Sequence, residues 1–162
     1  KTRQRCVLFT GEYEHAIDSK QRLAIPAEIR SALDPERDGK ALYLAPGANG
    51  HLWLWPEKTF ERIVGAMEQS LLPAEDLMEF DEFTFPQARR LEIDNAGRVR
   101  LPEQSLKDAG IEGAVVILGM RDHLELRDPA SWTAQREAMQ AKSREIFLRA
   151  RQAMLRSKQT EE

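Results

Sequence analysis

Two short segments of this sequence combine an aspartate with an arginine four residues later, a spacing suited to holding an anion. They are Asp18–Arg22 and Asp94–Arg98, with Lys20 and Arg100 beside the two arginines. A guanidinium group offers a planar fork of N–H donors that matches phosphate oxygens or the O6/N7 edge of guanine. The spacing equally fits an Asp–Arg pair that only holds a tight turn. Residue types alone leave both interpretations open.

Both segments belong to a longer internal repeat. Residues 17–26 and 93–102 share Ile, Asp, Arg and Pro in register at an offset of 76, and both end in proline. Residues 51–60 match 123–132 at an offset of 72, so the first copy carries four extra residues between the two matches. Such self-similarity indicates two copies of one small β unit and therefore two related loops.

Each copy has the pattern of a strand, an aspartate loop, a strand, a short helix, a hairpin and a helix. Helices are expected at 27–33, 56–71, 74–83 and 103–109, with Gly110 just past the last of these, where glycine often ends a helix. Asp-Pro and Asp-Gly pairs predict turns over 34–39. Apolar residues seven apart predict one long helix after Pro129. The expected strands are 6–10, 12–17, 23–25, 41–45, 51–55, 89–93, 99–101, 115–118 and 123–126. Because such short strands are unstable alone, we expect the two copies to interleave into one small barrel.

The aspartates have a predicted role in shaping the loops. Aspartate favours turns by accepting hydrogen bonds from backbone N–H groups two residues further along, so Asp18 and Asp94 are expected to define their loops. Gly97 supplies a positive φ at the fourth loop position, whereas the first loop has Gln21 there. The first turn therefore either avoids positive φ or carries some strain.

Composition narrows the class of protein. The chain has 162 residues, a net charge of −3 and 31% charged residues, which fits one domain or two very small ones. Halves of this size bury too little surface to be stable alone, so close packing of the halves or oligomerisation is expected. Basic residues gather locally: residues 130–160 hold seven Lys or Arg against Glu137 and Glu145. A local patch, and not the total charge, decides whether a protein binds phosphate.

Other function classes are disfavoured. The single cysteine, Cys6, allows no disulfide within the chain, and no apolar run is long enough for a membrane span, so we expect a cytoplasmic protein. No metal site, cofactor site or nucleophile motif is recognisable, and we expect no enzyme. His51 and His123 occupy equivalent repeat positions and are interpreted as structural. Trp53 and Trp55 are expected to pack against the following helix or a neighbouring subunit.

At this point the motifs resemble a known family. Glu12–His15, Ile17–Pro26 and Ile93–Pro102 are similar to the MraZ family, although Gln21 stands where that family usually has glycine. The resemblance runs from about Phe9 to Trp132. It implies an α+β fold of two pseudo-twofold-related AbrB-like β modules in a small double-split β-barrel, with helices after each module and a long C-terminal helix.

The resemblance also implies a function. It is that of a transcriptional regulator of the division and cell-wall gene cluster, associated with the nucleoid. Such a protein forms ring-shaped homo-oligomers and binds short direct repeats in its own promoter DNA. The implied DNA-binding residues are Lys20, Arg22, Arg98 and Arg100, with Asp18, Asp94 and Gly97 shaping the loops. The implied domains are SpoVT–AbrB-like modules at 12–59 and 88–131, a helical connector at 60–87 and an amphipathic helix at 132–162.

Two questions stay open at the level of sequence. An antitoxin-like or scaffold module of the AbrB type, which mainly binds protein, is the alternative function. The C-terminal helix fits docking on a neighbouring subunit, packing on its own chain or gripping DNA, and its apolar stripe favours docking. Because only the first loop contains a second cation, Lys20, we expect the first module to supply most of the sequence readout.

Overall fold

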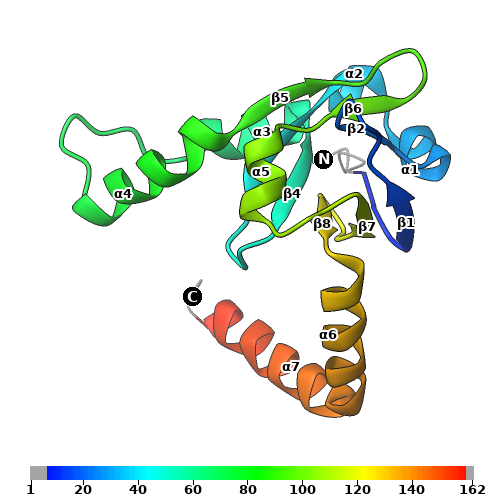
Figure 1. The fold of residues 1–162 in the computed structure, drawn as a ribbon. Coiled ribbons are helices and arrows are strands. Elements are labelled where there is room, and N and C mark those ends of the chain that lie inside the picture. Colours follow the sequence, from blue (N-terminus) through cyan, green and yellow to red (C-terminus); the bar gives the residue numbers. More distant parts are fainter. Residues whose placement is uncertain (1–6, 160–162) are drawn as a thin grey trace. The chain divides into compact units, whose positions relative to one another are not determined.

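The two sequence repeats fold as interleaved halves of one β structure. The computed structural model describes residues 7–159, which leaves Cys6 outside the described residues. The elements are shown in Figure 1 and are, in chain order, β1 (Glu12–Ala16), β2 (Arg22–Ala24), α1 (Ala27–Ala32), α2 (Pro35–Asp38), β3 (Ala41–Pro46), β4 (Leu52–Pro56), α3 (Glu57–Gly65), α4 (Glu75–Thr84), η1 (Phe85–Gln87), β5 (Arg89–Glu92), β6 (Arg98–Arg100), α5 (Glu103–Asp108), β7 (Ala114–Gly119), β8 (Leu124–Arg127), α6 (Pro129–Ala141) and α7 (Ser143–Gln159).

The strand pairing crosses from one repeat to the other. Strand β1 pairs with β7, β5 with β3, β4 with β8 and β2 with β6, all antiparallel. Only the hairpins β3–β4 and β7–β8 stay within one repeat. The expected interleaving is therefore confirmed, and neither half has a complete sheet without the other.

The pairing differs from the predicted barrel. Six strands form a sheet in the order β1-β7-β8-β4-β3-β5, and β2 and β6 form a separate two-stranded ribbon. Among the described residues no pairing closes the sheet, because β1 and β5 are its edges and β2 and β6 pair only with each other. The arrangement is an open sheet with a ribbon, in an α+β fold of two repeated β modules.

One core joins the ribbon to the sheet. The inward residues of the ribbon, Leu23 and Val99, are almost fully buried. They belong to the same hydrophobic cluster as Leu44, Leu54 and Ile117 of the sheet. Helices α1 and α5 add Ile29 and Leu106 to this cluster. Burial of these side chains holds the ribbon against the sheet.

The helix boundaries follow local chemistry. Pro56 ends β4, and Pro26 and Pro102 follow β2 and β6 by two residues; the three prolines stand at the N-caps of α3, α1 and α5. Helix α5 ends at Asp108 with Ala109 as its C-cap, and Gly110, whose φ is 67°, follows as the expected C′ glycine. There the Gly110 N–H donates to the Lys107 carbonyl and the Ile111 N–H to the Leu106 carbonyl, which is a Schellman motif.

Two predicted helices and one predicted turn region differ from the structure. The helix predicted over 56–71 ends at Gly65, a residue that weakens a helix interior. The turn region after Asp34 contains a single helical turn, α2, because the Asp34 side chain accepts from the Glu36 and Arg37 N–H groups as an N-cap. The long C-terminal helix is broken at Lys142 into α6 and α7, although its seven-residue apolar spacing continues through the break.

The expected strand over 6–10 is reduced to an isolated bridge between Phe9 and Arg121 in its described part.

The chain separates into two compact units, one ending at Asp128 and one beginning at Pro129. No helix within the described residues is long and apolar enough to cross a membrane.

A buried polar network lies on the face of the sheet that points away from the core. The Glu125 carboxylate accepts from Arg127 Nε and Nη2 at 3.0 and 2.6 Å and from Asn49 Nδ2 at 3.3 Å. His123 stacks between Trp53 and Trp55, with ring centroids 4.2 and 4.6 Å apart. His123 thus packs on the tryptophans of β4, and the tryptophans lie against β8 as well as toward α3.

The network fixes the charge states of its members. Burial raises the pKa of Glu125, but hydrogen bonds from His123 and Arg127 outweigh burial and lower the pKa to about 2. Burial lowers the pKa of His123, but its hydrogen bonds with Glu125 and Asp122 outweigh burial, so that pKa is raised. Both ring nitrogens face carboxylate oxygens, at 2.8 and 3.4 Å, which favours the imidazolium form.

The network gives a testable pH dependence. Because the folded-state pKa of His123 lies above its unfolded value, its stabilising contribution is complete below about pH 6.5 and is lost as the pH rises through the folded-state value. We expect the urea midpoint to fall between pH 6 and pH 9, and to fall less in His123→Gln. His15→Gln, which removes an imidazole on edge strand β1 outside the network, is the control for loss of a histidine. If the urea midpoint of His123→Gln fell with pH as much as that of wild type, the proposed contribution of His123 to stability would be wrong.

Candidate nucleic-acid interface

The two aspartate loops have the same internal geometry. Asp18 Oδ1 accepts from the Lys20 and Arg22 N–H groups, each at 2.9 Å, and Oδ2 accepts from Arg22 Nε at 2.7 Å. Asp94 makes the corresponding three bonds, to the Ala96 and Arg98 N–H groups at 2.9 Å and to Arg98 Nε at 3.0 Å. Each aspartate thus binds both the backbone and the arginine of its own loop.

The same bonds keep both aspartates ionised. The backbone N–H of Arg22, followed by its guanidinium, lowers the pKa of Asp18 below its ordinary value. Arg98 lowers the pKa of Asp94 in the same way. A carboxylate that accepts several N–H bonds loses those interactions on protonation. Each loop therefore holds a charged aspartate that orients its arginine through Nε.

The arginines keep their terminal groups available. The Asp–Arg pair is the only hydrogen bond or ion pair of the Arg22 and Arg98 side chains within residues 7–159, so both Nη groups of each arginine lack a hydrogen-bond partner there. About a third of each side chain is exposed. Each arginine can therefore hold its turn and bind an anion at the same time. Nε binds the aspartate, and Nη1 and Nη2 remain for the anion.

The β2–β6 ribbon carries one aspartate loop at each end. In the β2–β6 register, Leu23 faces Val99, Arg22 faces Arg100 and Ala24 faces Arg98. Alternate residues of a strand point to opposite faces, and Leu23 and Val99 are buried in the core. Arg22, Arg98 and Arg100 therefore share the outward face. Arg100 is exposed, as its position in the alternation predicts.

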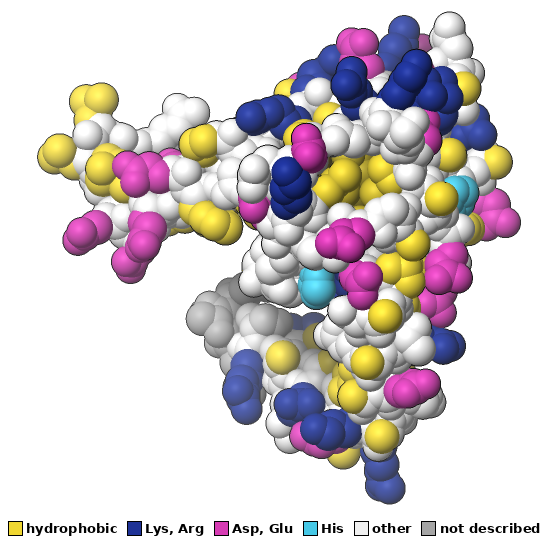
Figure 2. Space-filling model, viewed as in Figure 1, with side chains coloured by type: hydrophobic (Ala, Val, Ile, Leu, Met, Phe, Trp, Pro, Cys, Tyr) yellow, Lys and Arg dark blue, Asp and Glu magenta, His cyan; other side chains and the backbone are white. Residues whose placement is uncertain are grey.

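This face concentrates positive charge. Like charges directly opposite each other on two strands repel, as Arg22 and Arg100 must. Asp18 compensates Arg22, whereas Arg100 has no ion pair in the described part of the chain. Figure 2 shows Lys and Arg side chains gathered over the edge of this unit where β2, β6 and α1 lie. Binding of an anion to this face would reduce the repulsion between its arginines.

The structure adds a residue that the sequence analysis missed. The Arg30 guanidinium, on α1, lies against Gly97 of the second loop, and Arg30 Nε donates to the Ile25 carbonyl at 3.0 Å. A Cβ at residue 97 would lie only 2.7 Å from Arg30 Cζ. Nothing in the local sequence connects these residues. Only the antiparallel pairing of β2 with β6 brings the helix of one module to the loop of the other.

The first loop has a different neighbour. The pKa of Glu103, on α5, is lowered chiefly by Lys107 and further by a hydrogen bond from Gln21. Gln21 has a φ of 60°, so the first turn does adopt the positive φ that glycine provides in the second, where Gly97 has a φ of 77°. Of the two alternatives for this turn, the strained one is realised.

Other candidate sites are not assembled. Within residues 7–159 no group of three or more His, Cys, Asp or Glu side chains could hold a metal ion. Burial lowers the pKa of His51, whereas hydrogen bonds with Glu125 and Asp122 raise that of His123. On the ribbon face, in contrast, cations of both repeats lie close together.

The packing of Arg30 on Gly97 can be tested by substitution. Gly97→Ala forces an L residue into positive φ, at about 1–2 kcal/mol, and also displaces Arg30 from its bond to Ile25. Gly110→Ala is the matched control, because Gly110 has a φ of 67° with nothing within 4 Å of an added Cβ. We expect Gly97→Ala to lower the free energy of unfolding by roughly 1 kcal/mol more than the control.

In an Arg30→Ala background that difference should vanish, as urea unfolding of the double variants would show. Equal losses for the two alanine variants in the wild-type background would mean that Arg30 does not pack on the loop.

Comparisons with known proteins agree with the repeat and its loops. A family model described as "MraZ protein, putative antitoxin-like" matches residues 8–80 and 84–154. The chain is 32% identical to a transcriptional regulator MraZ of Heliobacterium modesticaldum over 130 residues, covering 80% of this chain and 87% of the relative. It is 31% identical to the protein of that name from Thermomicrobium roseum over 142 residues, covering 88% of this chain and 96% of the relative.

A third relative, from Roseiflexus castenholzii, is 30% identical over 134 residues and carries the same name. The two matches of the family model correspond to the two repeats, with their interruption in α4. The family is not an enzyme family, in agreement with the interpretation of the sequence. The resemblance drawn from the loop motifs is confirmed: this chain belongs to the MraZ family.

Proposed function

We propose that this protein is a sequence-specific DNA-binding transcriptional regulator that contacts DNA through the β2–β6 ribbon. The observation that carries the proposal is the outward face of this ribbon, where Arg22, Arg98 and Arg100 lie side by side above a buried Leu23–Val99 pair. A two-stranded antiparallel ribbon fits the major groove of B-DNA. The names of the MraZ relatives support the same class of function.

The Asp–Arg pairs suit base recognition. With Nε held by the aspartate, Nη1 and Nη2 of Arg22 or Arg98 remain to bind guanine O6 and N7 in a bidentate fashion. The ion pair also holds each guanidinium in place before binding, which reduces the entropy lost on association. The aspartates therefore act as positioning residues for the arginines.

Other cations on this side suit the phosphate backbone. Lys20 lies in the first loop and is exposed, Arg100 is exposed on β6, and Arg30 flanks the second loop. Each lysine or arginine that neutralises a phosphate releases counterions and steepens the salt dependence of binding. These residues add affinity, whereas the paired arginines add sequence preference.

The positive charge near the two loops is more nearly equal than the sequence suggests. The expected dominance of the first module rests on Lys20, which has no counterpart inside the second loop. Arg30 gives the second loop a further cation from a helix of the first module, and Glu103 places a negative charge near the first loop. Arg22 and Arg98 are therefore proposed as comparable DNA contacts.

The proposal includes assembly and targets. Several copies of the chain in a ring would present several ribbons, and effective concentration then favours operators made of short direct repeats. We place these operators in the promoter of the protein's own gene, within the division and cell-wall cluster, and the protein at the nucleoid in the cytoplasm. The modules at 12–59 and 88–131 would supply the ribbon. The connector 60–87 and the helix 132–162 would supply the surfaces through which the copies assemble.

The alternative is an AbrB-type module that mainly binds protein. The description of the family as antitoxin-like and an apolar groove beside α4 favour it. In that case the ribbon would be structural, and removal of its arginines would leave DNA binding as it was.

Fluorescence anisotropy with a duplex from upstream of the protein's own gene tests the proposal. Arg22→Ala and Arg98→Ala should each cost about 1–3 kcal/mol of specific binding free energy. Lys20→Ala should weaken binding to all sequences alike and reduce the salt slope by about one.

The control is Arg62→Ala, which removes an exposed arginine of α3 away from the ribbon and should leave affinity unchanged. A scrambled duplex of equal composition measures the nonspecific part of binding. Wild-type affinity in folded Arg22→Ala and Arg98→Ala proteins would sink the proposal and favour the protein-binding alternative.

A further inference from the structure

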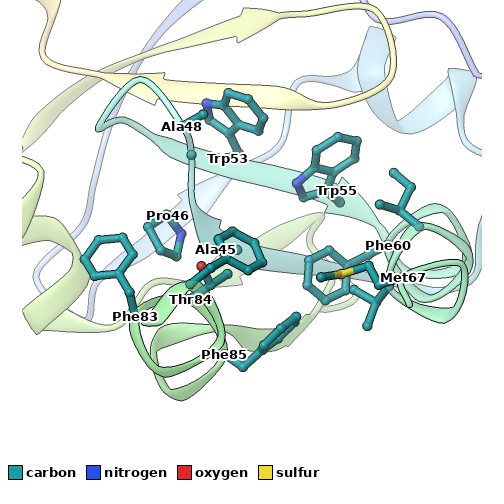
Figure 3. A pocket seen from close by; sticks show the side chains of 14 residues that line it. Ala45, Pro46, Ala48, Trp53, Trp55, Phe60, Met67, Phe83, Thr84 and Phe85 are labelled. Carbon is teal, nitrogen blue, oxygen red and sulfur yellow. The ribbon is translucent and has the colours of Figure 1, made fainter. Parts of the chain in front are cut away.

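An apolar groove lies on the face of the sheet opposite the ribbon. It has a volume of about 380 Å³ and runs between the β3–β4 hairpin, α3 and the end of α4. Figure 3 shows the Trp53 and Trp55 rings of β4 facing Phe83 and Phe85 across it, with Phe60 and Met67 at one end. Phe83 is 60% exposed. A groove this aromatic and open to solvent marks a binding surface.

Beyond Phe83, outside the groove lining, α4 carries a row of acidic residues, here called the acidic rim. It consists of Glu75, Glu79 and Glu82 at helical spacing, with Glu79 one turn before Phe83. None of the three has an ion pair in the described residues, and Figure 2 shows acidic side chains gathered on this helix. A partner helix that places cations beside an apolar stripe would complement this rim.

Helix α7 has that pattern. Phe147, Ala150 and Met154 stand at i, i+3 and i+7, the spacing of anchors that enter a groove from one helix face. Phe147 is 78% exposed and Met154 is 66% exposed. Arg144, Arg151 and Lys158 form a basic row along one flank of the stripe, without an ion pair in the described part of the chain.

We propose that α7 of one copy docks in this groove of a second copy, with Phe147 and Met154 in the groove and the basic row against the acidic rim of α4. The inference deepens the assembly part of the proposed function. Groove and helix are different surfaces, so the contact is head-to-tail, and such contacts close into rings when the rotation between copies permits. It uses the exposed apolar surface of both elements, which a solitary chain would leave in water.

The test mixes two variants of the full chain that are each defective on one side of the contact. Phe83→Glu damages the groove and Phe147→Glu damages the helix, both at exposed positions. Each alone should fall to the mass of one 18.5 kDa chain in light scattering, whereas wild type forms a multiple of it. A 1:1 mixture should form a two-chain species, because the intact helix of one variant fits the intact groove of the other.

Leu71→Glu and Leu148→Glu are the controls, since both remove an exposed leucine off the groove and off the stripe and should leave the mass unchanged. A second, milder pair is Glu79→Lys and Arg151→Glu, where each alone should weaken assembly and the double variant in one chain should restore it. Circular dichroism verifies folding.

Single-chain mass for wild type, unchanged mass in both phenylalanine variants, or a mixture that stays as single chains would each overturn the inference; the first result would mean that α7 docks on its own chain or not at all. DNA is absent from this experiment. A result that rules out docking of α7 would therefore say nothing about the DNA contacts of the ribbon, which the anisotropy experiment tests separately.

Discussion

The antiparallel pairing of β2 with β6 is the contact on which the rest of the structure depends. It buries Leu23 against Val99, and because side chains alternate along a strand, that burial forces the arginines of both loops outward. Opposed arginines repel, so the arrangement needs the aspartates, which bind the Nε group of Arg22 and Arg98. Core packing thus holds together two strands that the repulsion between their arginines would otherwise drive apart.

The same pairing makes each half dependent on the other. The sheet takes strands from both repeats, and the helix that follows one loop lies beside the opposite loop, as Arg30 lies against Gly97. The two sites are nevertheless unequal. Arg30 has no basic counterpart in the second repeat, and Gln21 holds a positive φ where Gly97 needs no strain. Near-symmetry of the backbone therefore coexists with asymmetry of charge.

The sheet separates two surfaces with different chemistry. On β4, Leu52 and Leu54 face the core that supports the ribbon, and Trp53 and Trp55 face the other way, toward the groove. The buried Glu125–Arg127 pair and the stacked His123 support the tryptophans from β8. The proposed DNA contact and the proposed contact with a second copy therefore use different side chains on opposite faces of the sheet.

The sequence by itself determined the repeat, the strand and helix types, the aspartate turns and the MraZ family, because these depend on spacing and local backbone chemistry. It also determined that Arg100 would be exposed, from alternation alone. Tertiary structure decided which strands pair, that the described strands form an open sheet with a separate ribbon, and that Arg30 joins the second loop. It also decided where helices end, at Gly65 and Lys142, against an apolar pattern that continues. Short strands carry too little pattern to specify their partners, and a side chain reaches a loop distant in sequence only after the core has brought the two together.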